Sequence, residues 1–406
     1  MTPPTDAPAP LTSRLTTLLA VAIGIIVANL YYLQPLLHQV SKDFSVGITH
    51  ATLLMTLIQA GYAIGLAFVV PLGDVVARRR LAVSIFALAA AMMLLTATLH
   101  SFLLLTLVMM VIGLTSVGGQ VLIPLAADLA AESQRGRVIA RVMSGLLVGI
   151  LLSRTFSGLI AQWAGWRSVY LIAAGALAVM AVLLWASIPD EAPRPRVAYR
   201  RLIGGVFSLY RTEPVLRRRA YLGAMIFACN NVLWTTLSYL LAGSPFHYSN
   251  AVIGLFGLFG VGGVMAANAA GHQADRQRQS VTTIVFAALL LASFGMLALG
   301  RGDVAALAVG IVLLDTGMQG TQITNQSVIY GLLPEARSRI NSAYMVAGFT
   351  GASLGSYLSG EAYAHFGWYG DCGLGAVLGA GLLVPAVLWR RSAAPRPRRA
   401  VAGADS

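Results

Sequence analysis

Charged residues are scarce in this chain. Asp, Glu, Lys and Arg make up 11% of its 406 residues, and hydrophobic residues make up 57%. A soluble domain carries about 25% charged residues, so this composition excludes one. Cysteine is scarce too, and we interpret Cys229 and Cys372 as packed free thiols, because their spacing suits neither a metal site nor a disulfide framework. The chain is therefore predicted to be an integral membrane protein.

Several chemical signatures are also missing. The sequence has no phosphate-binding glycine loop, no cluster of metal ligands, and no nucleophile paired with a general base. We therefore expect neither an enzyme nor a bound cofactor or metal. The net charge of +13 does not indicate a nucleic-acid partner, because the arginines lie in the loops between apolar segments.

The sequence does contain apolar segments long enough to cross a bilayer as helices. They lie at about 15–38, 50–72, 81–98, 102–126, 139–162, 168–187, 220–242, 250–270, 281–299, 304–330, 342–364 and 370–389. We predict an all-α integral membrane protein with twelve transmembrane helices.

The basic residues of the loops fall almost entirely on one side. If the N-terminus is cytoplasmic, only Lys42, Arg167 and Arg301 face outside, whereas the other loop arginines face inside. Cytoplasmic loops of membrane proteins carry such an excess of Lys and Arg. The sequence thus predicts a multi-pass protein of the inner membrane with both termini in the cytoplasm.

The longest loop divides the twelve segments into six and six. We expect a disordered cytoplasmic tail at 1–14, a six-helix bundle at 15–187, a cytoplasmic linker at 188–219, a second six-helix bundle at 220–389 and a basic cytoplasmic tail at 390–406. In the linker, Ile203, Val206, Phe207 and Tyr210 recur at helical spacing among arginines. This pattern predicts an amphipathic helix on anionic lipid at the inner membrane face, and the alternative is a solvated basic linker.

The two halves of the sequence are similar to each other. A single alignment of the first half on the second, without a gap, pairs Gln120 with Gln322, Arg135 with Arg337, Gly149 with Gly351, and Gly165–Trp166 with Gly367–Trp368. A shift of six helices preserves their direction, so the halves are predicted to be parallel repeats around a central cavity. Transporters with this symmetry hold their substrate site between the repeats.

The segment 304–330 carries a polar stripe. Asp315, Gln319, Gln322 and Gln326 fall on one side of a helix. A carboxylate at the centre of a bilayer costs at least about 2.5 kcal/mol, so the stripe must face protein or water. We favour a helix that lines a solute path over a polar seam between helices, because a seam does not need an acid.

With these features the chain resembles the major facilitator superfamily. The loop at 70–80 is similar to the family pattern G-x-L-A-D-R-x-G-R-R at its Leu, Asp and Arg–Arg positions, and the second copy at 271–276 keeps Gly, Ala, Asp and Arg. The resemblance implies a gate, and the alternative is a topology anchor. Its residues would be Asp74, Arg78, Arg79, Asp275 and Arg276.

Two further stretches are similar to efflux proteins within this superfamily. Gly149 and Gly158 match the outer glycines of the helix-5 pattern of drug–proton antiporters, but Arg154 stands where that pattern has proline. The stretch 28–37 resembles a bacterial branch labelled as arabinose or drug efflux permeases. The resemblance implies a drug:proton antiporter-like transporter of a drug-like or sugar-like compound.

The family's arrangement implies that helices 1, 4, 7 and 10 line the cavity, and that helices 3, 6, 9 and 12 face lipid. The implied substrate-binding residues are Asn29, Tyr32, Gln34, Gln120, Asn230, Asn231, Trp234, Gln319, Gln322 and Gln326. Tyr32 and Trp234 either stack on a solute or only form the wall.

Arg154 and Asp315 are the two charges deepest in the predicted membrane. They either pair with each other across the halves or meet the substrate. We expect Asp315 to take up a proton or to sense a cationic group. Glu361, near the outer end of helix 11, is expected to be an interfacial acid, and the alternative is a role in gating.

The leading functional hypothesis is proton-coupled efflux of a small organic compound by a monomer that alternates its access. Protons and that compound are the predicted partners, together with the lipid of the bilayer. The alternatives are an importer, either a symporter or a uniporter, and a sensor or scaffold that transports nothing.

Overall fold

The computed structural model describes residues 12–189, 199–260, 279–332 and 337–391. Within these ranges the chain is almost entirely helical and contains no strand. Nine helices of the described part are long and apolar enough to cross a membrane. The last of them contains Gly367, whose φ of 61° and ψ of −154° interrupt the helix, so it covers two predicted segments. The twelve-helix all-α prediction is confirmed.

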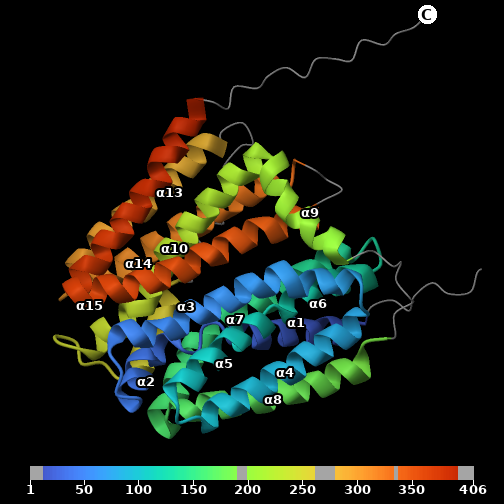
Figure 1. Ribbon diagram of the computed structural model, residues 1–406, viewed down its shortest axis with the longest axis horizontal. Helices are drawn as coiled ribbons and strands as arrows, with labels where there is room; N and C mark the ends of the chain where they lie inside the picture. The colour runs from blue at the N-terminus through green and yellow to red at the C-terminus, as the bar shows by residue number, and fades with distance from the viewer. Residues whose placement is uncertain (1–11, 190–198, 261–278, 333–336, 392–406) are drawn as a thin grey trace, which may run out of the picture.

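The first half contains the following elements, which Figure 1 shows in blue to green: α1 (Ser13–Ala28), α2 (Leu37–Asp43), α3 (Ile48–Ile64), α4 (Arg78–Thr98), α5 (Phe102–Thr115), α6 (Gly118–Leu129), α7 (Arg135–Ala164) and α8 (Trp166–Ser187). The second half contains α10 (Pro214–Ala242), α11 (Asn250–Leu255), α13 (Gln279–Leu299), α14 (Val304–Ile329) and α15 (Arg337–Arg391). The connecting helix is α9 (Tyr199–Thr212).

Several predicted membrane segments are broken helices. The first segment leaves the α-helix at Asn29, where i→i−3 hydrogen bonds such as Leu30 N–H to Val27 O replace the normal ladder. It continues through a short 3-10 turn that contains Pro35, which has no N–H to donate. The fourth segment is interrupted between α5 and α6. These breaks place unwound backbone inside the protein, which is where a membrane protein tolerates it.

Small residues bring helices of the same half into close contact. A Cβ atom on Gly149 of α7 would lie 2.3 Å from the carbonyl oxygen of Gly24 in α1. In the second half, a Cβ atom on Gly351 of α15 would lie 2.2 Å from the carbonyl oxygen of Ala224 in α10. Helix pairs in membranes approach this closely where small residues meet. Both halves therefore use the same packing between their first and fifth membrane segments.

The glycines that the sequence repeat aligns share an unusual conformation. Gly165 has a φ of 79° and Gly367 has a φ of 61°, a region that favours glycine. Each is followed by a buried tryptophan, Trp166 or Trp368. The same turn thus begins the sixth and the twelfth segments.

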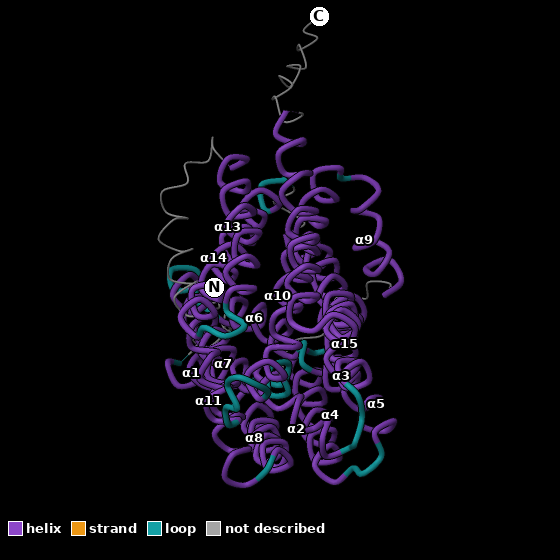
Figure 2. The backbone as a smooth tube through the Cα atoms, turned by 90° about the vertical axis from the view of Figure 1, so that its left-hand side faces the viewer, coloured by secondary structure: helices purple, strands orange, loops and turns teal. Residues whose placement is uncertain are grey.

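The largest contacts between the halves are made by two pairs of elements. Helix α3 packs along α15, and α7 packs against α11, as Figure 2 shows. Asn250 in α11 donates a hydrogen bond to Gln39 in α2 at 2.6 Å. Ser353 in α15 donates one to the carbonyl oxygen of Thr56 in α3 at 2.9 Å.

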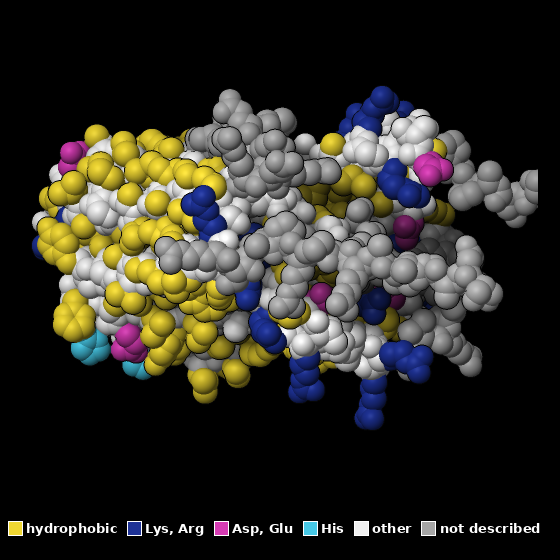
Figure 3. Space-filling model, turned by 90° about the horizontal axis from the view of Figure 1, so that it is seen from above, with side chains coloured by type: hydrophobic (Ala, Val, Ile, Leu, Met, Phe, Trp, Pro, Cys, Tyr) yellow, Lys and Arg dark blue, Asp and Glu magenta, His cyan; other side chains and the backbone are white. Residues whose placement is uncertain are grey.

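Basic side chains gather toward one end of the molecule, whereas much of the remaining surface is hydrophobic (Figure 3). We call this the basic end, defined by Arg78, Arg79, Arg135, Arg217 and Arg339. The loops of the opposite end contain a smaller polar cluster in which Arg167 donates a hydrogen bond to Asp43. Burial acts to raise the pKa of Asp43, but hydrogen bonds from Arg167 and Trp166 outweigh it and hold that pKa below its ordinary value.

Helix α9 packs on protein at the basic end. Its apolar side chains Val206 and Leu209 are buried together with Ile340 and Tyr344 of α15. The hydroxyl of Tyr199 donates a hydrogen bond to the carbonyl oxygen of Phe68, 2.5 Å away in the first half. The buried face of α9 lies against the second half, whereas its arginines remain exposed.

Candidate functional site

Arg154 and Asp315 lie buried where the two halves meet. Arg154 comes from α7 and has 7% of its surface exposed, and Asp315 comes from α14 with 8% exposed. Both project beside the eighth segment, which offers glycines at Gly254, Gly257 and Gly260. A Cβ atom on Gly257 would lie 3.0 Å from Arg154, and one on Gly260 would lie 2.6 Å from Asp315 Oδ2. The glycines therefore provide the space that both side chains occupy.

Aromatic rings surround the Arg154 guanidinium. It lies 4.0 Å from the ring centre of Trp234 and 4.8 Å from that of Tyr31. Its Nε donates a hydrogen bond to Gln34 Oε1 at 2.5 Å. Cation–π contacts of this kind strengthen when the cation is desolvated. Side chains of the first and seventh segments thus hold an arginine of the fifth segment in place.

Asp315 has a different partner. Its Oδ1 accepts a hydrogen bond from Asn230 Nδ2 at 2.9 Å. Asn230 and Trp234 are one turn apart on α10, so a single face of this helix contacts both charges. No ion pair within 4 Å joins Arg154 to Asp315, nor does any other described residue form one with either.

The remaining polar residues of the α14 stripe are only partly buried. Gln319, Gln322 and Gln326 are partly exposed, and within the described chain their side chains make no hydrogen bond. Gln120 of α6 is also partly exposed, and its amide nitrogen lies 3.4 Å from the hydroxyl of Tyr62. These amides remain available to a solute.

Five of the predicted substrate-binding residues are buried: Asn29, Tyr32, Gln34, Asn231 and Trp234. Asn231 accepts a hydrogen bond from Gln59 of the first half at 2.8 Å. Tyr32 lies in the hydrophobic core, and Tyr31 takes the position beside Arg154. Asn29 is 2% exposed, and its side chain finds no hydrogen-bond partner in the described residues.

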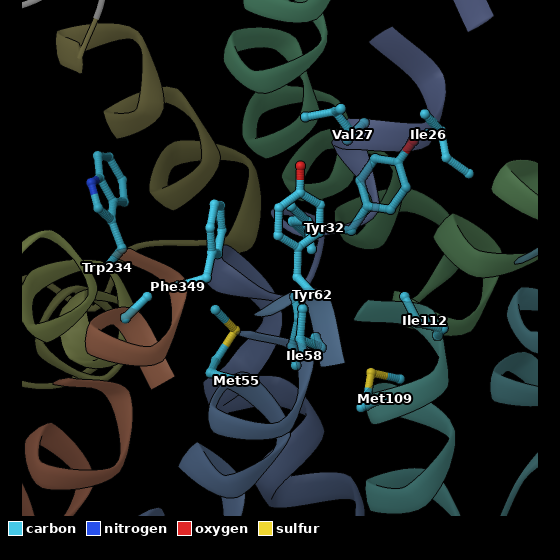
Figure 4. Packing of buried hydrophobic residues seen from close by; sticks show 14 of the residues in the cluster. Ile26, Val27, Tyr32, Met55, Ile58, Tyr62, Met109, Ile112, Trp234 and Phe349 are labelled. Carbon is cyan, nitrogen blue, oxygen red and sulfur yellow. The ribbon is translucent and has the colours of Figure 1, made fainter. Parts of the chain in front are cut away.

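Aromatic residues from both halves meet beside this region. The rings of Tyr62 and Phe349 lie 4.2 Å apart between α3 and α15, and Figure 4 shows them next to each other, with Trp234 and Tyr32 to either side. This contact belongs to the interface between the halves.

The predicted gate residues within the described part, Asp74, Arg78 and Arg79, lie at the basic end. Arg78 contacts Asp128 at 2.5 Å and Asp74 at 3.5 Å. Arg79 donates a hydrogen bond to the carbonyl oxygen of Trp185 at 2.6 Å. Asp275 and Arg276 lie outside the described residues.

Asp371 is a further buried acid, which was not among the residues predicted from the sequence. This side chain is 1% exposed in α15 and accepts hydrogen bonds from Thr236 at 2.5 Å and from Ser359 at 2.7 Å. The sequence did contain a signal for it, because an acid just inside the apolar segment 370–389 is unusual. The family's arrangement implies that this segment faces lipid. No group of three or more His, Cys, Asp or Glu side chains suitable for a metal occurs among the described residues.

The fold and the buried charged site define a class, the membrane transporters built from two similar halves. Residues 19–355 match the model of the Major Facilitator Superfamily. The chain belongs to this family.

Named relatives agree with this assignment. The uncharacterized transporter YgaY of Escherichia coli O157:H7 is 45% identical over 94% of this chain and 96% of its own. The inner membrane transport protein YnfM of Escherichia coli K12 is 25% identical over 90% of this chain and 88% of its own.

Solved structures share the fold. A bacterial homologue of the human lysosomal transporter Spinster, inward-facing and occupied, has a TM-score of 0.73 at 13% identity and covers 95% of this chain and 97% of its own. A peptide transporter POT in complex with alafosfalin has a TM-score of 0.73 at 17% identity and covers 95% of this chain and 98% of its own.

Proposed function

We propose that this membrane transporter is a proton-coupled secondary transporter of a small organic compound, and that Asp315 is the group that binds the proton. The observation that carries the proposal is the position of Asp315 between the halves, buried and without a cation at ion-pair distance. A charged carboxylate in this environment is costly, and binding a proton removes the cost.

The surroundings of Asp315 can change with conformation. Its amide partner Asn230 is in α10, Gly260 belongs to the eighth segment, and Arg154 belongs to the other half. Movement of one half against the other alters the distance between Arg154 and Asp315. Proton affinity would then differ between the two states, as coupling to transport requires. We place the basic end in the cytoplasm, with both termini there, because of the arginine distribution.

Export in exchange for protons is the direction that the resemblance to efflux proteins implies. Symport with protons is the second candidate. It is favoured by a specific observation, namely that Arg154 is buried without an acidic partner among the described residues.

The test is transport by purified protein in proteoliposomes. Uptake and counterflow would be measured at a series of pH values with labelled organic acids, sugars and cationic dyes. Asp315→Asn should remove the pH dependence of transport, because the amide cannot exchange a proton. Asp303→Asn is the matched control, since Asp303 is an exposed acid that caps the same helix through Ala305 N–H. An Asp315→Asn protein with the wild-type pH profile would exclude Asp315 as the coupling group.

A further inference from the structure

Arg154 is a buried cation with no acidic side chain at ion-pair distance among the described residues, and Asp315 acts on it only from farther away. Its Nε is bonded to Gln34, but its terminal nitrogens make no hydrogen bond with the described residues. These nitrogens are not among the buried polar atoms sealed inside the described structure. Arg154 borders a small gap that is also lined by Gln34, Trp234, Ser238 and Ile253. In the described conformation this gap is about 10 Å³, room for about one water-sized group, so a larger ligand of Arg154 needs the site to open.

The contacts of Arg154 prepare it for a particular kind of ligand. Trp234 and Tyr31 hold the guanidinium between the first and seventh segments, and neither ring takes up a terminal N–H donor in a hydrogen bond. A planar arginine fork binds carboxylate or phosphate oxygens through two parallel hydrogen bonds. Such a buried cation is costly unless it is paired during function. We propose that Arg154 is the anion-binding group of the substrate site, and that the substrate is an organic oxyanion.

This inference rests on the proposed function and also specifies its coupling. The titratable and charged groups that face Asp315 from the described residues are Arg154 and Tyr31. When Asp315 is charged, it reduces the positive potential that Arg154 offers to an anion, and it repels that anion. When Asp315 is protonated, both effects disappear, so proton and anion bind together. Joint binding corresponds to symport, because a proton and substrate that travel together must occupy the same state.

The proposal is tested by binding to the purified full chain, with thermal unfolding and tryptophan fluorescence as readouts. The probes share a phenyl ring and differ in one group: benzoate, benzenesulfonate and phenyl phosphate against neutral benzamide. We expect at least one oxyanion to bind and stabilise the protein, and benzamide to bind much more weakly. Which oxyanion binds best distinguishes a carboxylate from a sulfonate or phosphate substrate. Failure of all three oxyanions, or equal binding of benzamide, would overturn the proposal.

Variants assign the effect to Arg154. Arg154→Gln should weaken oxyanion binding at least about thirtyfold, because losing one member of a buried charged pair costs about 2 kcal/mol or more. Arg154→Lys keeps the charge, and should bind more weakly than wild type but still prefer the oxyanion to benzamide. Arg301→Gln is the control, because Arg301 is exposed and lies over Tyr369 away from the site. Wild-type affinity in Arg154→Gln would contradict the assignment.

Asp315→Asn separates this inference from the proposed function. In the wild type, oxyanion affinity should rise as the pH falls over a range in which the probe stays ionised. In Asp315→Asn, affinity should be retained and become independent of pH. If affinity is retained but still varies with pH as in the wild type, the role of Asp315 fails while the anion site stands. If the variant and the wild type both favour benzamide, the anion site fails irrespective of Asp315.

Discussion

Arg78 connects acidic side chains from two membrane segments at the basic end. It lies 2.5 Å from Asp128 of α6 and 3.5 Å from Asp74, and it is largely buried, whereas both acids are exposed. Asp128→Asn should therefore slow transport more than Asp74→Asn, because it removes the shorter contact and the one between residues far apart in the sequence. Stability should change by no more than about 1 kcal/mol, as is usual for exposed ion pairs.

Initial transport rates, normalised to the amount of inserted protein, test this prediction. Glu132→Gln is a suitable control, since Glu132 is a nearby exposed acid that forms no ion pair in the described part of the chain. If both aspartate variants transport at the wild-type rate, Arg78 and its partners are a topology anchor and not a gate.

For single residues, the sequence indicates which ones are unusual but does not identify what they contact. Arg154 and Asp315 stand out because each is a charge inside a long apolar segment. The sequence left open whether they pair, and the structure instead places Arg154 against Trp234 and Asp315 against Asn230. These partners depend on the rotation of each helix about its axis. Hydropathy does not determine that rotation, which is also why Tyr31 rather than Tyr32 contacts Arg154.

Helix α7 depends on glycine for its contact with α1. A Cβ atom on Gly149 would lie 2.3 Å from Gly24 O and 2.5 Å from Gly24 Cα, so Gly149→Ala forces two backbones apart. The expected loss of stability is about 1–3 kcal/mol, typical of overpacking. Gly175→Ala in α8 is the matched control, because its new Cβ meets no atom within 4 Å. It should be neutral or stabilising by about 1 kcal/mol, since alanine favours helix. Thermal unfolding in detergent measures both, and equal stability of the two variants would contradict the packing argument.

The sequence predicts where the helices lie along the chain better than it predicts where they are broken. The twelve apolar segments correspond to helices of the structure or to described parts of them, because each must satisfy its backbone within the bilayer. The unwound turn at Asn29 and the break between α5 and α6 were not predicted. Both occur inside apolar segments, where neighbouring helices rather than local residues determine whether the helix continues. Pro35 is the local signal for the first of these breaks.

For the whole molecule, the internal repeat predicts more than the composition does. It aligns Gly165 with Gly367, and both adopt the same left-handed turn before a buried tryptophan. Hydropathy and the repeat do not reveal which conformation of a two-state transporter is adopted, because two packings of one sequence differ by only a few kcal/mol. In the described structure, α7 meets α11 and α3 meets α15 across the interface. Alternating access requires some of these contacts to separate.

The contact between Gln39 and Asn250 is the most direct test of that separation. It joins α2 of the first half to α11 of the second through a 2.6 Å hydrogen bond. With Cys229 and Cys372 replaced by alanine, Gln39→Cys and Asn250→Cys can be joined by a short thiol cross-linker. If the halves move apart here, cross-linking should stop transport, and a cleavable linker should restore it on reduction. The matched control is Asp43→Cys with Arg167→Cys, two residues in contact within the first half, whose cross-link should leave transport intact. Full turnover by the Gln39–Asn250 cross-linked protein would show that this contact stays closed throughout the cycle. The moving interface would then have to lie between α3 and α15.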